Sequence, residues 1–360
     1  MIVRVPAGEL ATFVAGSLEG LGVPGGDAAA VAEVLLYADL RGLDAHGVYR
    51  LPAYLERVSL GLAHGTAELA EVAGSGAVRR IDAGFALGPA AATTATDLAV
   101  RLAREHGIGL VGVGRSTHLG AAGFYALRAA QQEMVAFVLS NGPRVVAPAG
   151  AAEPFLGTNP IAIGIPLGRH GAYVHDMATG ASRAKIRRAA DAGVPIAPGE
   201  AVDADGRPTT DAAAALLGSV LPVGGAKGSG LSVAIALLAG MLGGAEFDDE
   251  IAETYGAMDR PQNIGHVVVV IDPWCLGPRE ESLARVEAMV DRMHALRPAE
   301  GVERVRFSGE LAARRAEQRA AEGIPLAVNE LRRLAQACER YGLVEQAAWA
   351  AGRAGTVASR

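Results

Sequence analysis

The chain has 360 residues, of which 50% are hydrophobic and 20% charged, so it can bury a large core and is expected to form two or three units. Its net charge of -6 and its dispersed basic residues predict a small-molecule partner and no nucleic-acid footprint. Cys275 and Cys338 stand outside any metal-type cluster and the histidines lack ligand spacing, which predicts reduced thiols and no structural metal.

Residues 8 to 60 are expected to be helical. Apolar residues recur at helical spacing from Leu10 to Leu18 and again from Val31 to Ala38, with a glycine break and Asp27 as an N-cap between them. The N-terminus lacks the apolar core of a signal peptide, and no apolar run reaches the ~20 residues that a membrane span needs. We therefore expect a cytoplasmic protein without a membrane segment.

His46, Arg50 and Tyr54 follow at intervals of four residues. If their segment is helical, the three side chains project from one face and could hold a carboxylate, with Arg50 giving a bidentate contact. A glycine and a proline within the segment make such a helix imperfect. The alternative is a solvated face with Asp44 paired to a nearby arginine.

The next elements are a strand at Val78 to Ile81, a helix from Ala86 to His106 and a strand at Ile108 to Val113. A G-x-G-x-x-G pattern begins at Gly107. A dinucleotide fingerprint needs a strand before it and a helix after it, whereas here the order is reversed. We therefore discard the pattern as a cofactor signal.

His118 follows this buried strand, within the block R-S-T-H-L-G-A-A-G-F-Y from Arg115 to Tyr125. Histidine is the side chain best able to exchange a proton near neutral pH, and the small residues after it allow close approach of a ligand. A catalytic acid/base is one interpretation. A core or capping histidine is the other, because a lone histidine is weak evidence.

A helix at Ala121 to Gln132 and strands at Met134 to Ser140 and Ile161 to Pro166 come next, without an alternating βαβ run. The chain from Ala172 to Gly225 is expected to be rich in loops. It carries four basic residues between Ser182 and Arg188, which could meet a phosphate or simply be solvated.

The loop G-G-A-K-G-S-G (Gly224 to Gly230) precedes an apolar helix from Leu231 to Leu242. Free backbone N–H groups, the positive end of the helix dipole and Lys227 would meet here, which is typical of an anion-binding loop. The spacing is not that of a Walker A motif. The alternative is a plain helix-entry loop with an exposed lysine.

The C-terminal part is expected to contain a β-branched strand at His266 to Ile271 and two amphipathic helices, one from Leu283 to Met293 and one from Val328 to Cys338. The final residues, 346–360, are assigned to a disordered tail because the last ten show no pattern.

Several blocks together resemble the malate/L-lactate dehydrogenase family, which is unrelated to the ordinary lactate dehydrogenases. They are A-D-L-R-G-L-D-A-H-G-V-Y-R, S-T-H-L-G-A-A-G, L-G-T-N-P-I-A, H-D-M-A-T, D-G-R-P-T-T-D, G-G-A-K-G-S-G-L and Q-N-I-G-H-V-V-V-V-I-D-P. The resemblance runs from about Val31 to Leu326. It implies an α/β, non-Rossmann NAD(P)-binding fold with a helical domain built from the N- and C-terminal segments.

The resemblance also implies hydride transfer between NAD or NADP and C2 of a small 2-hydroxy/2-oxo carboxylic acid, in a homodimer. The catalytic residues it implies are His118, as proton donor and acceptor, and His46. The substrate-binding residues it implies are Arg50, Tyr54 and Arg115. The cofactor-binding residues it implies are Asn141, Thr158, Asn159, Asp176, Met177, Ala178, Thr179, Lys227 and Gly228.

Several positions depart from the pattern of the family. Ala45 stands where relatives usually carry serine, the Gly180 to Lys185 segment is short, and Ser308 replaces the usual residues before Gly309. These changes leave two alternatives beside the 2-hydroxy acid dehydrogenase. One is a reductase of cyclic imino acids such as piperideine- or pyrroline-2-carboxylate, and the other is a family member without catalysis.

The implied division of the chain has four structured units and a tail. Residues 1–75 form an N-terminal helical segment, 76–117 and 224–300 a central α/β domain, 118–223 an inserted NAD(P)-binding domain, and 301–345 helices that pack on the helical domain.

Overall fold

The computed structural model describes residues 1–253 and 257–355. It is built around a seven-stranded sheet in the order β2-β3-β4-β11-β5-β6-β7. Its strands are β2 (Ala70–Ser75), β3 (Val78–Asp82), β4 (Ile108–Ser116), β11 (Ile264–Ile271), β5 (Val135–Ser140), β6 (Ile161–Pro166) and β7 (Ala172–Met177). β3 and β4 pair in parallel and the other neighbours are antiparallel. Since a Rossmann sheet is parallel, the sheet confirms the non-Rossmann expectation.

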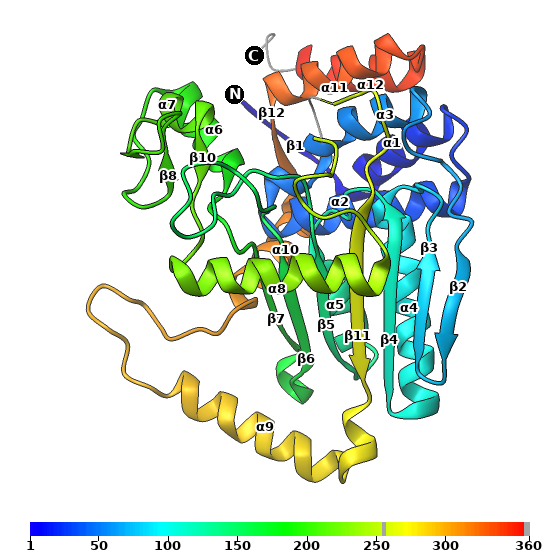
Figure 1. The fold of residues 1–360 in the computed structure, drawn as a ribbon, viewed down its shortest axis with the longest axis vertical. Helices are drawn as coiled ribbons and strands as arrows, with labels where there is room; N and C mark the ends of the chain where they lie inside the picture. The colour runs from blue at the N-terminus through cyan, green and yellow to red at the C-terminus, as the bar shows by residue number, and fades with distance from the viewer. Residues whose placement is uncertain (254–256, 356–360) are drawn as a thin grey trace.

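Helices cover both faces of this sheet (Figure 1). α4 (Gly88–His106) and α5 (Ala122–Ala130) pack on one face through buried alanines, and α8 (Ala226–Gly243) crosses the other. α8 can approach β4 closely because the strand has a glycine there: a Cβ on Gly112 would lie 2.2 Å from the Leu242 carbonyl oxygen. By length and composition alone α8 could span a membrane, with a hydropathy of 1.4, and the core helix of a soluble protein passes the same test.

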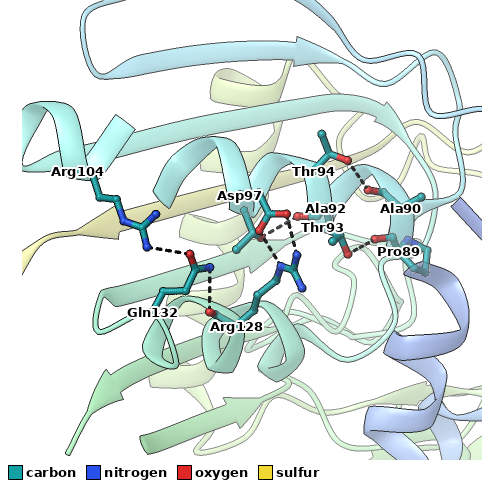
Figure 2. Close-up of polar contacts among 10 residues, drawn as sticks. Pro89, Ala90, Ala92, Thr93, Thr94, Asp97, Arg104, Arg128 and Gln132 are labelled. Atoms are coloured by element: carbon teal, nitrogen blue, oxygen red, sulfur yellow. Dashed lines mark hydrogen bonds and ion pairs between the residues drawn. The ribbon is translucent and has the colours of Figure 1, made fainter. Parts of the chain in front are cut away.

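A bidentate ion pair joins α4 to α5 on their face of the sheet (Figure 2). Arg128 on α5 donates from Nε and Nη2 to the two carboxylate oxygens of Asp97 on α4, at 2.7 and 2.8 Å. Arg104 donates to the side chain of Gln132, just beyond α5, at 3.0 Å. These contacts tie together the two helices whose N-terminal ends border the candidate site described below.

A helical unit combines both ends of the chain. Its elements are β1 (Ile2–Val5), α1 (Ala7–Glu19), α2 (Gly25–Arg41), α3 (Leu51–Ser59), β12 (Ile324–Ala327), α11 (Val328–Arg340) and α12 (Val344–Gly355). β1 pairs with β12, and the ring of Trp349 stacks on Phe13 at 4.5 Å. The tail expected over 346–360 is therefore wrong as far as Gly355, because alanines buried at helical spacing pack α12 onto the unit. Residues 356–360 lie outside the described residues.

A small lobe projects beside the helical unit (Figure 1). It contains α6 (Arg183–Ala192), β8 (Ala201–Val202), β9 (Pro208–Thr209), α7 (Ala212–Leu217) and β10 (Ser219–Val220), around a core of its own. The expected loop-rich region therefore contains an edge strand, β7, and a helix, α6. The sequence pattern missed them because β7 is half-buried throughout and α6 buries only Ile186.

The sheet also joins two units that the sequence reading separated. β5, β6 and β7 lie within the expected 118–223 domain, yet they continue the sheet through β11. The boundary at residue 118 therefore does not separate two cores, because the separate core comprises the small lobe and the adjoining residues near Val146 and Leu156. The chain then runs through η4 (Pro273–Leu276), the exposed α9 (Arg279–His294) and α10 (Glu310–Glu322), which contacts α2.

Candidate active site

The turn after β4 presents His118 at the end of the sheet. The N-terminus of α4 presses against this turn, where Gly88 donates its N–H to Thr117 Oγ1 at 2.8 Å. A Cβ on Gly88 would lie 2.3 Å from the Thr117 carbonyl oxygen, so a larger residue would displace the turn. Gly120, with φ of 82°, lets the chain turn into α5 directly after the histidine.

One nitrogen of His118 is held by its surroundings. Nδ1 lies 3.0 Å from Tyr54 Oη and accepts the Gly120 N–H at 3.2 Å. The His46 ring stacks beside it, with centroids 5.9 Å apart. Within the described part of the chain, no hydrogen bond is found for Nε2 of His118. A backbone N–H can only donate, so the neutral ring carries its proton on Nε2.

The segment with His46, Arg50 and Tyr54 is not one helix. It forms two single turns, η1 (Asp44–His46) and η2 (Val48–Arg50), followed by α3, because Gly47 between the turns is extended. The buried Asp39 carboxylate explains the break: its Oδ2 accepts the Val48 N–H at 2.8 Å, and a Cβ on Gly47 would lie 1.7 Å from its Oδ1.

The three side chains nevertheless converge on His118. Tyr54 contacts the His118 ring directly and His46 stacks on it. Arg50, whose Nε donates to the Ala45 carbonyl at 2.8 Å, lowers the pKa of His118 through its charge. The alternative of a solvated face is therefore wrong for these three side chains. The ion pair expected for Asp44 does exist, and its partner is Arg319 on α10, at 2.9 Å.

The electrostatics of this cluster favour neutral imidazoles beside one fixed cation. Burial, and then Arg50, His46 and His266, hold the pKa of His118 well below its usual 6.5. Burial and the Arg50 charge lower the pKa of His46 to about 4. At neutral pH the Arg50 guanidinium is therefore the positive group of the cluster, an arrangement suited to a carboxylate.

A second histidine behind the site was missed by the sequence reading. His266 on β11 is fully buried, with Nδ1 2.9 Å from Ser140 Oγ and Nε2 2.9 Å from Ser116 Oγ. Burial lowers its pKa to about 4. It joins the ends of β4 and β5, between which β11 lies, and the strand pattern gave no signal for this because the partners come from distant segments.

Arg115 does not join the cluster. Its backbone has a positive φ of 50°, and its exposed guanidinium pairs with Asp82 at 2.7 Å and lies 4.5 Å from the Phe85 ring. The ion pair and the cation–π contact therefore account for its position on the surface. A substrate contact for Arg115 stays a prediction.

Among the predicted cofactor residues, Asp176 to Ala178 and the α8 entry loop can reach a ligand. Asp176, at the end of β7, accepts the Gly123 N–H with one carboxylate oxygen at 2.8 Å, while its other oxygen can accept from a hydroxyl. Gly224 and Gly225 both have positive φ and place exposed Lys227 in the first turn of α8. Acceptors for ribose hydroxyls and donors for phosphates fit a dinucleotide.

The other predicted cofactor side chains bind other parts of the protein. The Asn141 amide donates to the Glu246 carbonyl and accepts the Gly265 N–H, both at 2.8 Å. Asn159 is fully buried and donates to Ser232 and Asp248, and the Thr179 hydroxyl donates to the Thr158 carbonyl at 3.0 Å. These side chains brace the loops after β5 and β7, and a cofactor contact from them stays a prediction.

Residues 5–335 match the family model described as malate/L-lactate dehydrogenase, and the chain belongs to this family. Its α/β fold is that of the family's solved structures. The sulfolactate dehydrogenase structure from Methanocaldococcus jannaschii aligns with a TM-score of 0.88 and 34% identity, covering 95% of this chain and 98% of that one. The Δ1-piperideine-2-carboxylate reductase structure from Pseudomonas syringae aligns with a TM-score of 0.83 and 30% identity, covering 93% and 99%.

Curated relatives are similar along most of their length. The chain is 36% identical to L-sulfolactate dehydrogenase of M. jannaschii, over 91% of this chain and 94% of the relative. It is 36% identical to (2R)-3-sulfolactate dehydrogenase (NADP(+)) of Chromohalobacter salexigens, over 81% and 91%. It is 33% identical to ureidoglycolate dehydrogenase (NAD(+)) of Escherichia coli O157:H7, over 83% and 85%. The protein is thus an oxidoreductase of a family that acts on small hydroxy acids.

Proposed function

We propose that the protein transfers hydride between NAD or NADP and C2 of a small 2-hydroxy/2-oxo carboxylic acid, at the cluster around His118. The observation that supports this most is the placement of the Arg50 cation beside two histidines whose pKa values are held low. The site therefore attracts one carboxylate while keeping a ring nitrogen for proton exchange. The named relatives that oxidise sulfolactate and ureidoglycolate support the same substrate class.

In the proposed reaction each side chain of the cluster has a separate task. Arg50 holds the substrate carboxylate and so orients C2 and its oxygen toward His118. His118 exchanges a proton with that oxygen through Nε2. His46 stacks on His118 and, being neutral, leaves Arg50 as the group that binds the carboxylate.

The cofactor would supply or receive the hydride when bound. Asp176, Met177 and Ala178 at the end of β7 would hold its sugar, and the first turn of α8 with Lys227 would hold its phosphates. A relative named for NADP and a relative named for NAD are both similar to this chain, so the titration described below decides between the two cofactors.

We further propose that the enzyme works as a homodimer through the outer face of α8. This face exposes Leu231, Val233, Leu237, Leu238 and Met241, of which Met241 is 73% exposed. An exposed apolar row on a long helix is typical of an interface. Met241→Glu should convert the dimer to a monomer in analytical ultracentrifugation, whereas Leu276→Glu, at an exposed residue outside α8, should leave it intact.

A cyclic imino acid is the second candidate substrate, favoured by the likeness to the piperideine-2-carboxylate reductase structure. It carries the same carboxylate for Arg50. Its nitrogen can arrive already protonated, in which case the proton of His118 matters less. A 2-oxo acid and a cyclic imine therefore predict different sensitivities to replacement of His118.

The test of the function is a fluorescence titration of the purified protein with NADH and with NADPH, followed by a panel of 2-oxo acids and cyclic imines. Saturable binding of one cofactor and its oxidation by a 2-oxo acid would support the proposal. Oxidation by the imine alone would favour the second candidate. If neither NADH nor NADPH bound at millimolar concentration, the non-catalytic alternative would be favoured. In that case the short segment after Thr179 would no longer form a cofactor site.

A further inference from the structure

Tyr54 was expected to contact substrate, but its hydroxyl contacts the catalytic histidine on the side turned away from Nε2. The side chain is 2% exposed, and Oη lies 3.0 Å from Nδ1 of His118 and 3.4 Å from the His118 carbonyl oxygen. A hydroxyl can donate and accept, so it can bond Nδ1 in either protonation state by turning its proton.

Proton exchange through Nε2 sets a requirement on Nδ1. To donate from Nε2, His118 must be an imidazolium with protons on both nitrogens. To accept at Nε2, the neutral ring must carry its proton on Nδ1. In both directions Nδ1 is protonated, whereas the Gly120 N–H at 3.2 Å favours an unprotonated Nδ1.

Nothing anionic among the described groups acting on His118 would hold that proton. Arg50 on η2, His46 on η1 and His266 on β11 act on the ring from three elements, and each lowers its pKa. A catalytic histidine commonly relies on a carboxylate at this nitrogen. Of the two described groups that contact Nδ1, Tyr54 is the one that can accept.

We propose that Tyr54 is a positioning residue that accepts the Nδ1–H of His118 while Nε2 exchanges its proton with the substrate oxygen. When His118 is in its resting form, the Tyr54 hydroxyl donates to Nδ1. When Nδ1 is protonated, the hydroxyl turns to the His118 carbonyl oxygen and Oη accepts from Nδ1. This inference rests on the proposed function.

Reduction consumes one proton, which the resting neutral ring first takes up from solvent at Nδ1 to become the imidazolium. In reduction, the Nε2–H bond of the imidazolium breaks, its electron pair stays on Nε2, and an O–H bond forms on the substrate oxygen that gained charge through hydride addition to C2. The ring is left neutral with its proton on Nδ1, bonded to Tyr54 Oη. Oxidation runs through the same states in reverse.

Tyr54→Phe removes one oxygen atom and tests the proposal. We expect kcat for reduction to fall about 10-fold or more with KM within twofold, because a charge-assisted hydrogen bond to the active form of His118 is lost. The His118 pKa, followed by NMR, should move further down. Tyr49→Phe, a matched change on η2 at a ring that lies 3.9 Å from the Arg333 guanidinium, should alter neither.

Two results would overturn the proposal. A raised KM with unchanged kcat would return Tyr54 to substrate binding, and an unchanged His118 pKa would remove the coupling. In a double-mutant cycle with His118→Asn, Tyr54→Phe should add no further loss if it acts through the histidine. The NMR titration needs no turnover, so it separates failure of this inference from failure of the proposed function. Thermal unfolding checks that each variant is folded.

Discussion

The fully buried His266 and the half-buried His118 lie near the same end of the sheet and differ in what holds their rings. His266 has both nitrogens bonded to serine hydroxyls at 2.9 Å, on strands to either side of its own. His118 has its hydrogen bonds on Nδ1, and Nε2 finds no partner among the described residues. Burial lowers the pKa of both rings. A low pKa thus does not distinguish a catalytic histidine from a structural one, whereas a nitrogen without a hydrogen bond to any described residue does.

The largest stability effect should come from the structural member of the pair. His266→Leu removes the histidine hydrogen bond from each of two buried serine hydroxyls, so we expect the free energy of unfolding to fall by about 2–4 kcal/mol. Urea denaturation measures it. His118→Asn, at a ring with one nitrogen unbonded among the described residues, should cost less than about 1 kcal/mol. Equal losses in the two variants would remove the distinction between the two histidines.

The pH dependence of stability should also report His266. Its folded pKa of about 4 lies below the usual 6.5, so between these values the unfolded chain binds the extra proton and stability falls as pH falls. Relative to His266→Gln, which keeps both hydrogen bonds, the wild type should lose about 2 kcal/mol between pH 7.5 and pH 5. If the free energies of unfolding of the two proteins changed with pH in parallel, the lowered pKa of His266 would make no contribution to stability, contrary to this prediction.

Beside His118, substrate binding should require the planar guanidinium of Arg50 and not only its positive charge. Arg50→Lys keeps the charge but loses the bidentate contact, and we expect KM for the 2-oxo acid to rise about 10-fold with little change in kcat. Steady-state kinetics at saturating cofactor measure it. An unchanged KM would place the substrate carboxylate on another group.

The smallest effect should come from Arg115, which lies outside the cluster. Arg115→Ala breaks an exposed ion pair with Asp82, worth at most about 1 kcal/mol, and should leave KM within about twofold. Chemical denaturation and the same kinetic assay test both values. A large rise in KM would restore Arg115 to the substrate site.

The sequence predicted most of the sheet, because β4, β5, β6 and β11 are short apolar runs between turn residues. It also allowed the G-x-G-x-x-G pattern at Gly107 to be rejected, since that glycine ends α4 and precedes β4. The helix α12 was not predicted, because alanines, rather than large apolar residues, form its buried face.

The resemblance implied that His46, Arg50, Tyr54 and His118 share one site, and in the structure these four residues are neighbours. The single helix considered for three of them was wrong. The His266 bridge could not be predicted, because Ser116, Ser140 and His266 meet only through strand pairing over more than a hundred residues. The internal hydrogen bonds of the predicted cofactor residues were hidden for the same reason.

The most direct test of the central claim compares wild type and His118→Asn in the reduction of the preferred 2-oxo acid, with cofactor affinity measured in parallel. We predict that kcat falls by about 10²-fold or more, as expected for the loss of a general acid, while the affinity for NADH or NADPH stays within a fewfold. An unchanged kcat in a folded variant would contradict the assignment of proton transfer to His118.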